Sequence, residues 1–437
     1  MKPRPALPAG PYLVVGLARS GAAAVEMLRS HGEVMGCDSG EPPQASALEG
    51  VEIELRSDGL ELLERARTVV KNPGVPQAAP VIAAARERGL EVTGELELAW
   101  RLAPNEIVAV TGTNGKTTTT ELLGAIHRAA GIEVAVAGNV GTPLSAFAGG
   151  RLGREAVVVC ECSSFQLEDC SQFSPECAVL LNLEEDHLDR HGTLAAYRAA
   201  KRSIFAHQGA NDVAVAPPAL APSGPARVVS FDGGDADLSL REGRLLWHGD
   251  VLLETDELRL RGAHNLENAM AAAAAALARG VEPAAVSAAL RTFAGVPHRL
   301  EQVGERDGVL YVNDSKATNV AAARMGIEAF AGGVHAIVGG SLKGGGFAAL
   351  RPAVAARCQA AYLIGEAAPA LATELAGAAP LHVCGDLERA LAAASEAARA
   401  GEVVLLSPAC ASFDQYRDFE QRGEHFRALF AALQGHE

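Results

Sequence analysis

The sequence predicts an α/β protein whose 437 residues form three domains built on parallel sheets. Short apolar runs alternate with helical patterns, which is the rhythm of parallel strands joined by crossover helices. The chain is also too long for one hydrophobic core, and its pattern changes near residues 105 and 298. We therefore expect a Rossmann-like domain over 1–104, a central domain over 105–297 and a second Rossmann-like domain over 298–437.

The first block contains two clear strand candidates. The apolar run 12–16 predicts a strand, and 21–32 predicts a helix that Gly32 closes. The run 68–74 predicts a further strand with a turn, and 94–105 has the pattern of a connection into the second block.

The segment GLARSG at 16–21 joins the first strand to the first helix, where backbone amides can hold a phosphate. It lacks the middle glycine of the dinucleotide fingerprint, so a nucleotide diphosphate fits better than NAD. A tight turn without any ligand is the alternative. Asp38 comes at the end of EVMGCD (33–38), a further apparent strand, which is a common position for a ribose or base contact.

The second block carries the most specific motif of the chain. Strands are expected at 107–112, 156–164 and 177–183, and the alanine-rich run after 264–270 predicts a packed helix. The first strand leads into VTGTNGKTTTTE at 110–121, a phosphate loop one residue shorter than the usual form. Amides around Gly112, Thr113, Asn114, Gly115 and Lys116 can form an anion site, with Thr117 and Thr118 behind them. The motif predicts a P-loop-type ATP-binding domain.

Three side chains near this loop suit a magnesium–nucleotide site. Glu161 ends a buried strand, where a carboxylate is costly unless it is paired or bound to metal. His187 follows another strand end, and Lys201 lies on a helix. Taken singly, each has an ordinary structural explanation as a capped turn, a core histidine or a solvated lysine. Together with Lys116 at a neighbouring strand end, they predict a site at the carboxyl edge of a parallel sheet.

In the third block, strands are expected at 309–315, 334–340, 360–365 and 402–409, separated by helices.

Charge, hydropathy and cysteine content exclude several classes of function. The net charge of −15 argues against nucleic-acid binding, and no apolar stretch is long enough for a membrane span. The eight cysteines form no C-x-x-C pair, which argues against zinc and for a soluble, reduced, cytoplasmic protein.

Several segments resemble the Mur ligases, ATP-dependent amide ligases of bacterial cell-wall precursor synthesis. They include VTGTNGKTTTTE, GNVGTP (138–143), ECSSFQLE (161–168), NLEEDHLDRHG (182–192), HNLENAMAA (264–272), NDSKATN (313–319) and SPACASFDQYRDFEQRGEHF (407–426). The segments SSFQLE, NDSKATN and SPACASFDQ are most similar to the branch that adds D-glutamate. The resemblance spans residues 11 to about 427.

The resemblance implies ligation of D-glutamate to UDP-N-acetylmuramoyl-L-alanine through an acyl phosphate, by a monomer that uses ATP and two Mg²⁺ ions. The first domain would hold the UDP-sugar, the central domain ATP, and the third domain would bring in the amino acid. Facing the UDP-sugar would be Arg19, Ser20, Asp38, Asn72 and Gly74, with Asn139 near its muramoyl part.

The remaining roles follow from the same resemblance. Lys116 would bind ATP phosphates, and Asn268, Arg299 and Asp314 would contact the nucleotide. The two ions would be held by Thr117, Glu161, His187 and Lys201, with Lys201 carbamylated; His187 is equally a candidate base. The D-glutamate pocket would be lined by Lys316, Thr318, Lys343, Ser412, Phe413 and Phe419.

Two alternatives stay open at this point. One is another ligase of the same family that adds a different amino acid. The other is a nucleotide-dependent switch that hydrolyses ATP and joins nothing; it leaves Lys316, Lys343 and the 407–415 segment without a role.

Overall fold

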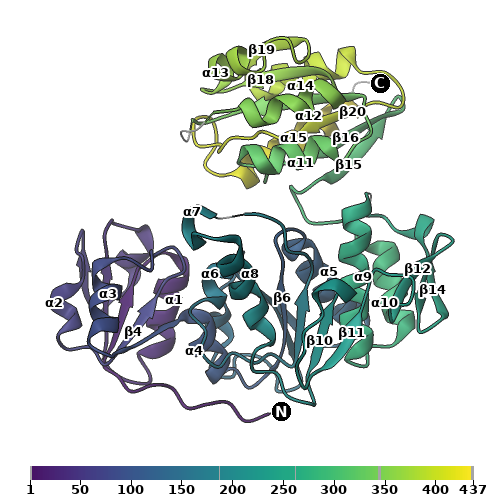
Figure 1. Ribbon diagram of the computed structural model, residues 1–437. Helices are drawn as coiled ribbons and strands as arrows, with labels where there is room; N and C mark the ends of the chain where they lie inside the picture. Colours follow the sequence, from purple (N-terminus) through teal and green to yellow (C-terminus); the bar gives the residue numbers. More distant parts are fainter. Residues whose placement is uncertain (1, 187, 261, 343–345, 435–437) are drawn as a thin grey trace. The chain divides into compact units, whose positions relative to one another are not determined.

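The computed structural model describes residues 2–186, 188–260, 262–342 and 346–434. The chain forms two compact units, Met1–Phe293 and Ala294–Glu437. The predicted α/β class with parallel sheets is confirmed, and Figure 1 shows the sheets with helices packed on their faces.

The first sheet has five parallel strands in the order β3-β2-β1-β4-β5. They are β1 (Tyr12–Val15), β2 (Val34–Asp38), β3 (Glu52–Leu55), β4 (Thr68–Lys71) and β5 (Glu91–Gly94). The helices are α1 (Arg19–Leu28), α2 (Leu60–Leu63), α3 (Pro80–Glu87) and α4 (Glu95–Leu102). Here two details differ from expectation. The first helix ends at Leu28 rather than Gly32, and most of the expected connection at 94–105 is helix α4.

The second sheet has six parallel strands in the order β11-β10-β9-β6-β8-β7. They are β6 (Glu106–Thr111), β7 (Val134–Gly138), β8 (Val157–Glu161), β9 (Cys177–Leu180), β10 (Val213–Ala216) and β11 (Arg227–Ser230). The helices are α5 (Lys116–Ala129), α6 (Ser164–Leu167), α7 (Leu188–His191), α8 (Leu194–Arg202), α9 (Ala263–Ala278) and α10 (Pro283–Thr292). The alanines of α9 from 271 to 276 are all buried, so the packed-helix prediction is confirmed.

A small antiparallel sheet was not expected. Strands β12 (Leu238–Arg241), β13 (Arg244–Trp247) and β14 (Asp250–Glu254) form it in sequence order. Strand β12 directly follows β11, and the parallel rhythm of the rest of the chain masked the hairpin pattern of these segments. The tight turn between β12 and β13 requires positive φ at Glu242 and Gly243.

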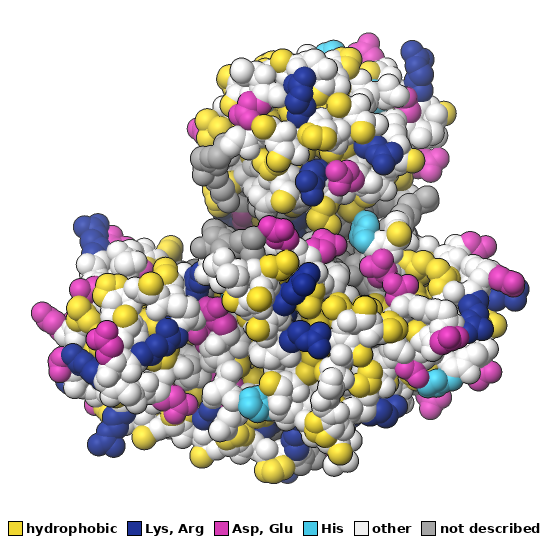
Figure 2. Space-filling view, viewed as in Figure 1, with side chains coloured by type: hydrophobic (Ala, Val, Ile, Leu, Met, Phe, Trp, Pro, Cys, Tyr) yellow, Lys and Arg dark blue, Asp and Glu magenta, His cyan; other side chains and the backbone are white. Residues whose placement is uncertain are grey.

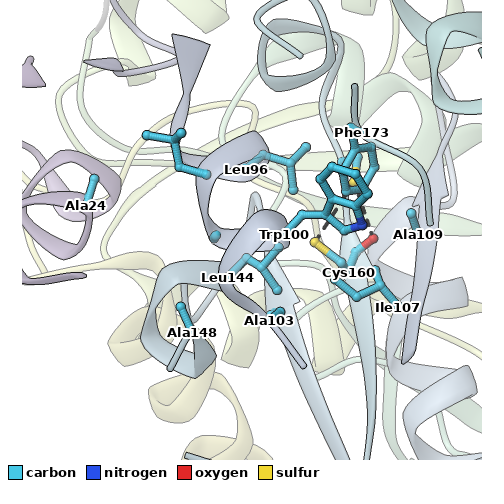
Figure 3. Packing of buried hydrophobic residues seen from close by; sticks show 14 of the residues in the cluster. Ala24, Leu96, Trp100, Ala103, Ile107, Ala109, Leu144, Ala148, Cys160 and Phe173 are labelled. Atoms are coloured by element: carbon cyan, nitrogen blue, oxygen red, sulfur yellow. Dashed lines mark hydrogen bonds between the residues drawn. The ribbon is translucent and has the colours of Figure 1, made fainter. Parts of the chain in front are cut away.

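Helix α4 lies in the core that the first two sheets of this unit share (Figure 3). Its Trp100 is 2% exposed and packs edge-on against Phe173, with ring centroids 5.8 Å apart. Apolar side chains from both sheets join this one cluster, including Val14 and Ala109. The shared core fixes the first sheet against the second, because dense packing tolerates little sliding.

The second unit has the sheet order β15-β16-β20-β17-β18-β19. Strand β15 is antiparallel to β16, and the other pairs are parallel. The strands are β15 (Glu301–Arg306), β16 (Val309–Asn313), β17 (Val334–Gly339), β18 (Cys358–Ile364), β19 (Leu381–Gly385) and β20 (Val403–Leu406). The helices are α11 (Val320–Glu328), α12 (Arg351–Arg357), α13 (Ala368–Glu374), α14 (Leu387–Ala397) and α15 (Phe419–Gln434).

Charged side chains of both signs are interspersed over the face that Figure 2 shows. Within the described ranges, no helix combines the length and apolar character needed to cross a bilayer.

Candidate active site

The phosphate loop runs from the end of β6 into α5. Gly115 stands immediately before the helix with φ +81°, in the left-handed region. A Cβ at this position would overlap Asn268 Oδ1 and lie 2.9 Å from Asn268 Cγ, so glycine is required for space as well as conformation. Lys116 and Thr117 then begin α5, whose N-terminus carries the partial positive charge that suits phosphate.

Part of the expected anion site is already engaged. The Thr113 amide donates to the Asn182 carbonyl at 3.1 Å, and the Asn114 amide donates to Asn182 Oδ1 at 2.8 Å. These two bonds fasten the loop to the end of β9. In this conformation the Thr113 and Asn114 amides are engaged within the protein, and the anion site around residues 112–116 stays a prediction.

Two lysines converge on the same carbonyl. Lys116 Nζ donates to Gly112 O at 2.9 Å and to Thr113 O at 2.8 Å, and Lys201 Nζ donates to Gly112 O at 2.7 Å. Lys201 is 2% exposed. Burial, followed by the charge of Lys116, lowers the pKa of Lys201 to about 7. The site thus holds one amine that is close to losing its charge at neutral pH.

Glu161 ends β8 and is 2% exposed. Its Oε2 accepts from Thr117 Oγ1 at 2.8 Å, and its Oε1 accepts from Asn139 Nδ2 at 3.0 Å. Carboxylate and hydroxyl oxygens at this edge are the hard donors that Mg²⁺ takes. Thr118, one residue further along α5, is buried beneath this edge.

A cavity of about 130 Å³ brings the two lysines together with Asn139, the amide partner of Glu161. It is lined by Lys116, Asn139, Ser163, Ser164, Phe165, Asp186, Tyr197 and Lys201. His187, predicted as a base or metal ligand, lies outside the described residues. Over the described ranges, no group of three or more His, Cys, Asp and Glu side chains is placed to hold a metal.

Several residues of this cavity were not predicted from the sequence. Tyr197 precedes Lys201 by four residues on α8, so the helical period places both on one face. The Tyr197 hydroxyl lies 3.0 Å from Thr113 Oγ1, and Lys201 Nζ lies 4.9 Å from the centre of the tyrosine ring. The four-residue spacing of Tyr197 and Lys201 could therefore have indicated from the sequence that Tyr197 lies beside Lys201. Ser163 caps the short helix α6 through a reciprocal bond with Gln166, a contact that brings Ser163 and Ser164 to the cavity.

The predicted UDP-sugar residues lie at the carboxyl edge of the first sheet. Arg19 and Ser20 begin α1, Asn72 and Gly74 follow β4, and Asp38 ends β2. Asn72 Oδ1 accepts from the Gly74 amide at 3.0 Å, which shapes this turn. Arg19 is exposed, and its guanidinium donates to Gly141 O at 3.1 Å.

Asp38 has a structural task that its sequence position did not reveal. Its Oδ2 accepts from the Leu17 amide at 2.7 Å, and its Oδ1 accepts from the Gly40 amide at 2.8 Å. Oδ2 therefore braces the GLARSG loop and Oδ1 braces the turn after β2, beyond any ribose contact. A Cβ at Gly21 would overlap the Gly16 carbonyl, so the close contact between the start of helix α1 and the end of strand β1 requires glycine at position 21.

Asn268 was expected to contact the nucleotide. In the structure it is 4% exposed and lies against the phosphate loop. Its Oδ1 accepts from Thr119 Oγ1 at 3.4 Å, and its Nδ2 donates to Asn265 Oδ1 at 3.3 Å. Asn268 therefore supports Gly115 from helix α9.

The second unit gathers its predicted residues at the carboxyl ends of β16 and β20. Asp314 follows β16, is 5% exposed, and accepts from Ser407 Oγ at 2.7 Å and from the Leu300 amide at 3.2 Å. Burial raises the pKa of Asp314 to about 7, although the two hydrogen bonds and the charge of Arg299 each lower it. Lys316 and Thr318 follow on the same loop, where both side chains are half-buried. Lys343 lies outside the described residues.

Arg422 on α15 is a buried cation that the sequence analysis did not single out. It is 1% exposed, and its guanidinium donates to the carbonyls of Ser315, Cys410 and Ala411 and to Ser315 Oγ. Burial lowers the pKa of Arg422 to about 10. It thereby joins the loop of Lys316 to the loop that carries Ser412.

The remaining predicted residues flank this junction. Ser412 is buried, Phe413 is 69% exposed, and the Phe419 carbonyl accepts from Ser315 Oγ at 2.8 Å. Phe419 also meets His298 edge-on, with ring centroids 6.2 Å apart.

The chain belongs to the Mur ligase family. Residues 11–94 match the family model of the Mur ligase MurD-like N-terminal domain, 110–276 the Mur ligase middle domain, and 298–410 the Mur ligase glutamate ligase domain. The resemblance inferred from the motifs is thereby confirmed.

Among its relatives are proteins named UDP-N-acetylmuramoylalanine--D-glutamate ligase. The one from Acidobacterium capsulatum is 42% identical over 97% of this chain and 96% of its own. The one from Anaeromyxobacter dehalogenans is 44% identical over 95% of this chain and 96% of its own. The solved UDP-N-acetylmuramate-alanine ligase of Thermotoga maritima shares the fold, with a TM-score of 0.59 at 20% identity over 97% of this chain and 99% of that chain.

Proposed function

We propose that this chain joins D-glutamate to UDP-N-acetylmuramoyl-L-alanine at the expense of ATP, giving ADP and phosphate, in cytoplasmic peptidoglycan precursor synthesis. The family and the names of the relatives support this substrate pair. We further propose that the protein acts as a monomer.

One observation carries the proposal. Lys116, Lys201 and Asn139 line a cavity at the carboxyl edge of a parallel sheet, and Asn139 donates to the Glu161 carboxylate at the end of β8. This edge is where open α/β sheets bind ligands, and the start of α5 supplies a phosphate-binding helix N-terminus there.

The chemistry needs an activated carboxylate, because a free carboxylate is a poor electrophile. In the proposed reaction the alanine carboxylate oxygen attacks the γ-phosphoryl group of ATP, forming an acyl phosphate and releasing ADP. The amine of D-glutamate then attacks the acyl carbon, loses a proton, and phosphate departs. Lys116 neutralises charge on the transferring phosphoryl group, which is the main contribution a protein makes to such a transfer. Exclusion of water protects the acyl phosphate from hydrolysis.

Oxygen donors at this edge fit magnesium. The carboxylate of Glu161 and the hydroxyl of Thr117 lie 2.8 Å apart, and we propose that they hold Mg²⁺ with Lys201 and His187, at two positions. When bound, the ions neutralise phosphate charge and orient phosphate oxygens. We propose that Lys201 serves in carbamylated form. Because burial lowers the pKa of its amine to about 7, a large share of the amine is neutral at pH 7, and its nitrogen can bond to the carbon of CO₂ and release a proton.

The three expected domains divide the work in this proposal. Residues 1–104 hold the UDP-sugar, 105–297 hold ATP, and 298–437 supply the D-glutamate site through Lys316, Thr318, Lys343, Ser412, Phe413 and Phe419. Asn139 lies near the muramoyl part, while Arg299 and Asp314 contact the nucleotide.

The test measures ADP release with ATP, UDP-N-acetylmuramoyl-L-alanine and a panel of amino acids. We expect release to depend on both the UDP-sugar and D-glutamate. A pocket built to pair a side-chain carboxylate rejects ligands lacking it by about 10⁴-fold or more, so L-alanine should not be joined. Efficient L-alanine incorporation would favour another ligase of the family. ADP release without either substrate would favour a nucleotide switch.

A further inference from the structure

A buried ion pair connects the first sheet to the segment that follows α6 within the Met1–Phe293 unit. Lys71 ends β4, immediately before the Asn72–Gly74 turn, and its side chain is fully buried. Its Nζ lies 2.7 Å from Asp169 Oδ2, and the Asp169 side chain is 2% exposed. Among the described residues, neither of these two atoms has a hydrogen-bond partner besides the other.

Further hydrogen bonds join the first domain to Glu168 and Asp169, next to this ion pair. Gln77 Nε2 donates to Glu168 Oε1 at 2.5 Å and to Asp169 Oδ1 at 2.9 Å. The Gly94 amide at the end of β5 donates to the Asp169 carbonyl at 3.2 Å. The segment after α6 therefore receives bonds from three points of the first domain.

A second cation, Arg190, binds the backbone of the turn that follows β4. Arg190 of α7 donates to the carbonyls of Pro73 at 3.1 Å and Val75 at 2.8 Å. It also pairs with Glu168 at 3.4 Å, and its guanidinium lies 4.9 Å from the centre of the Phe165 ring. Phe165 lines the cavity of Lys116 and Lys201, so the turn and the cavity share one set of supports.

A buried ion pair of this kind adds little net stability to a protein. Desolvating two charges costs about as much as their attraction returns, and a well-packed apolar pair is often as stable. Unlike an apolar contact, an ion pair fixes the distance between its two groups and their orientation. This pair joins the end of β4 to the segment after α6, so it fixes the position of the turn after β4, which is a proposed UDP-sugar contact.

We propose that Lys71 and Asp169 are positioning residues, which fix the Asn72–Gly74 turn at the distance from the phosphate cavity that phosphoryl transfer requires. This inference rests on the proposed function. The UDP-sugar would bind to the first domain with or without the pair. Only the approach of its carboxylate to the transferring phosphoryl group would depend on the pair.

The test compares steady-state kinetics and melting temperatures of the full chain carrying Lys71→Met, Asp169→Asn or both. In the double variant no charge is left buried, so its melting temperature should lie near that of the wild type. We expect its kcat to fall about 10- to 100-fold, since small misplacements of reacting groups cost this much. KM for ATP and for the UDP-sugar should stay near the wild-type values, since ground-state binding is retained.

Arg88→Met is the matched control, because it removes a pair with Glu64 in the same domain whose side chains are 42% and 67% exposed. It should leave kcat unchanged. A stable double variant with wild-type kcat would overturn the inference and leave the proposed function standing. If the double variant does not fold, Lys71→Met gives the comparison, because Asp169 keeps the bond from Gln77 and burial raises the pKa of its carboxyl, so that carboxyl can take a proton. A wild-type chain that does not join D-glutamate would refute the proposed function and this inference with it.

Discussion

Replacing Gly115 by alanine should damage the phosphate loop for two separable reasons. Gly115 has φ +81°, which an L-residue reaches only at a cost. An added Cβ would also overlap Asn268 Oδ1, and the Asn268 side chain is held in place by Thr119, which donates to its Oδ1, and by Asn265, which accepts from its Nδ2. Gly131, just past the other end of α5, has φ +72°, and no described atom lies within 4 Å of the place its Cβ would take. Gly131→Ala therefore measures the backbone cost alone.

The magnitudes follow from these environments. Gly131→Ala should lower the free energy of unfolding by about 1–2 kcal/mol, the cost of a left-handed L-residue. Gly115→Ala adds the overpacking of a filled site, about 1–3 kcal/mol, for a total of roughly 2–5 kcal/mol. Combining Gly115→Ala with Asn268→Ala removes the overlap, so the pair should cost less than the sum of the two single changes.

Urea unfolding followed by tryptophan fluorescence measures these values, because Trp100 and Trp247 both lie in the Met1–Phe293 unit. Binding of ATP to each variant, measured by calorimetry, should weaken with Gly115→Ala and stay unchanged with Gly131→Ala. Equal losses of stability at the two glycines, or strict additivity of Gly115→Ala and Asn268→Ala, would refute the role assigned to Asn268.

Three further predictions concern charged groups. Lys116→Ala should lower kcat about 10²- to 10³-fold with the fold intact, as for other preorganised charge donors; near-normal ligation would contradict its assignment. Lys201→Ala and Lys201→Arg should both lose most activity, and wild-type enzyme in ¹³C-bicarbonate should show a carbamate carbon signal; an active enzyme without that signal would exclude carbamylation. Burial raises the pKa of Asp314 to about 7, above its unfolded value. The folded state then keeps a proton that the unfolded state releases, so stability falls as pH rises from about 4 to 7, by up to ~4 kcal/mol. Asp314→Asn should therefore raise the melting temperature at pH 8 much more than at pH 5, and equal shifts at the two pH values would count against the buried carboxylate.

Local patterns in the chain were enough to predict the fold class and the centre of the site. Strand runs followed by glycine turns predicted parallel sheets, since both hydrophobic periodicity and turn chemistry are local properties. The phosphate loop is contiguous, so Gly115, Lys116 and Thr117 could be assigned from their spacing alone. Glu161 and Lys201 were found because a carboxylate at a buried strand end and a motif lysine stand out in the chain.

Which distant residues meet could be learned only from the packed chain. Asn268 lies against Gly115 although 153 positions separate them in the numbering, and Asn182 engages two amides of the loop. Lys71 and Asp169 look like ordinary surface charges in the sequence, and the packing of two sheets around α4 buries both. Burial, and with it the lowered pKa of Lys201 and the raised pKa of Asp314, depends on atoms from several elements at once. No local pattern encodes that environment, because desolvation is a property of the whole folded chain.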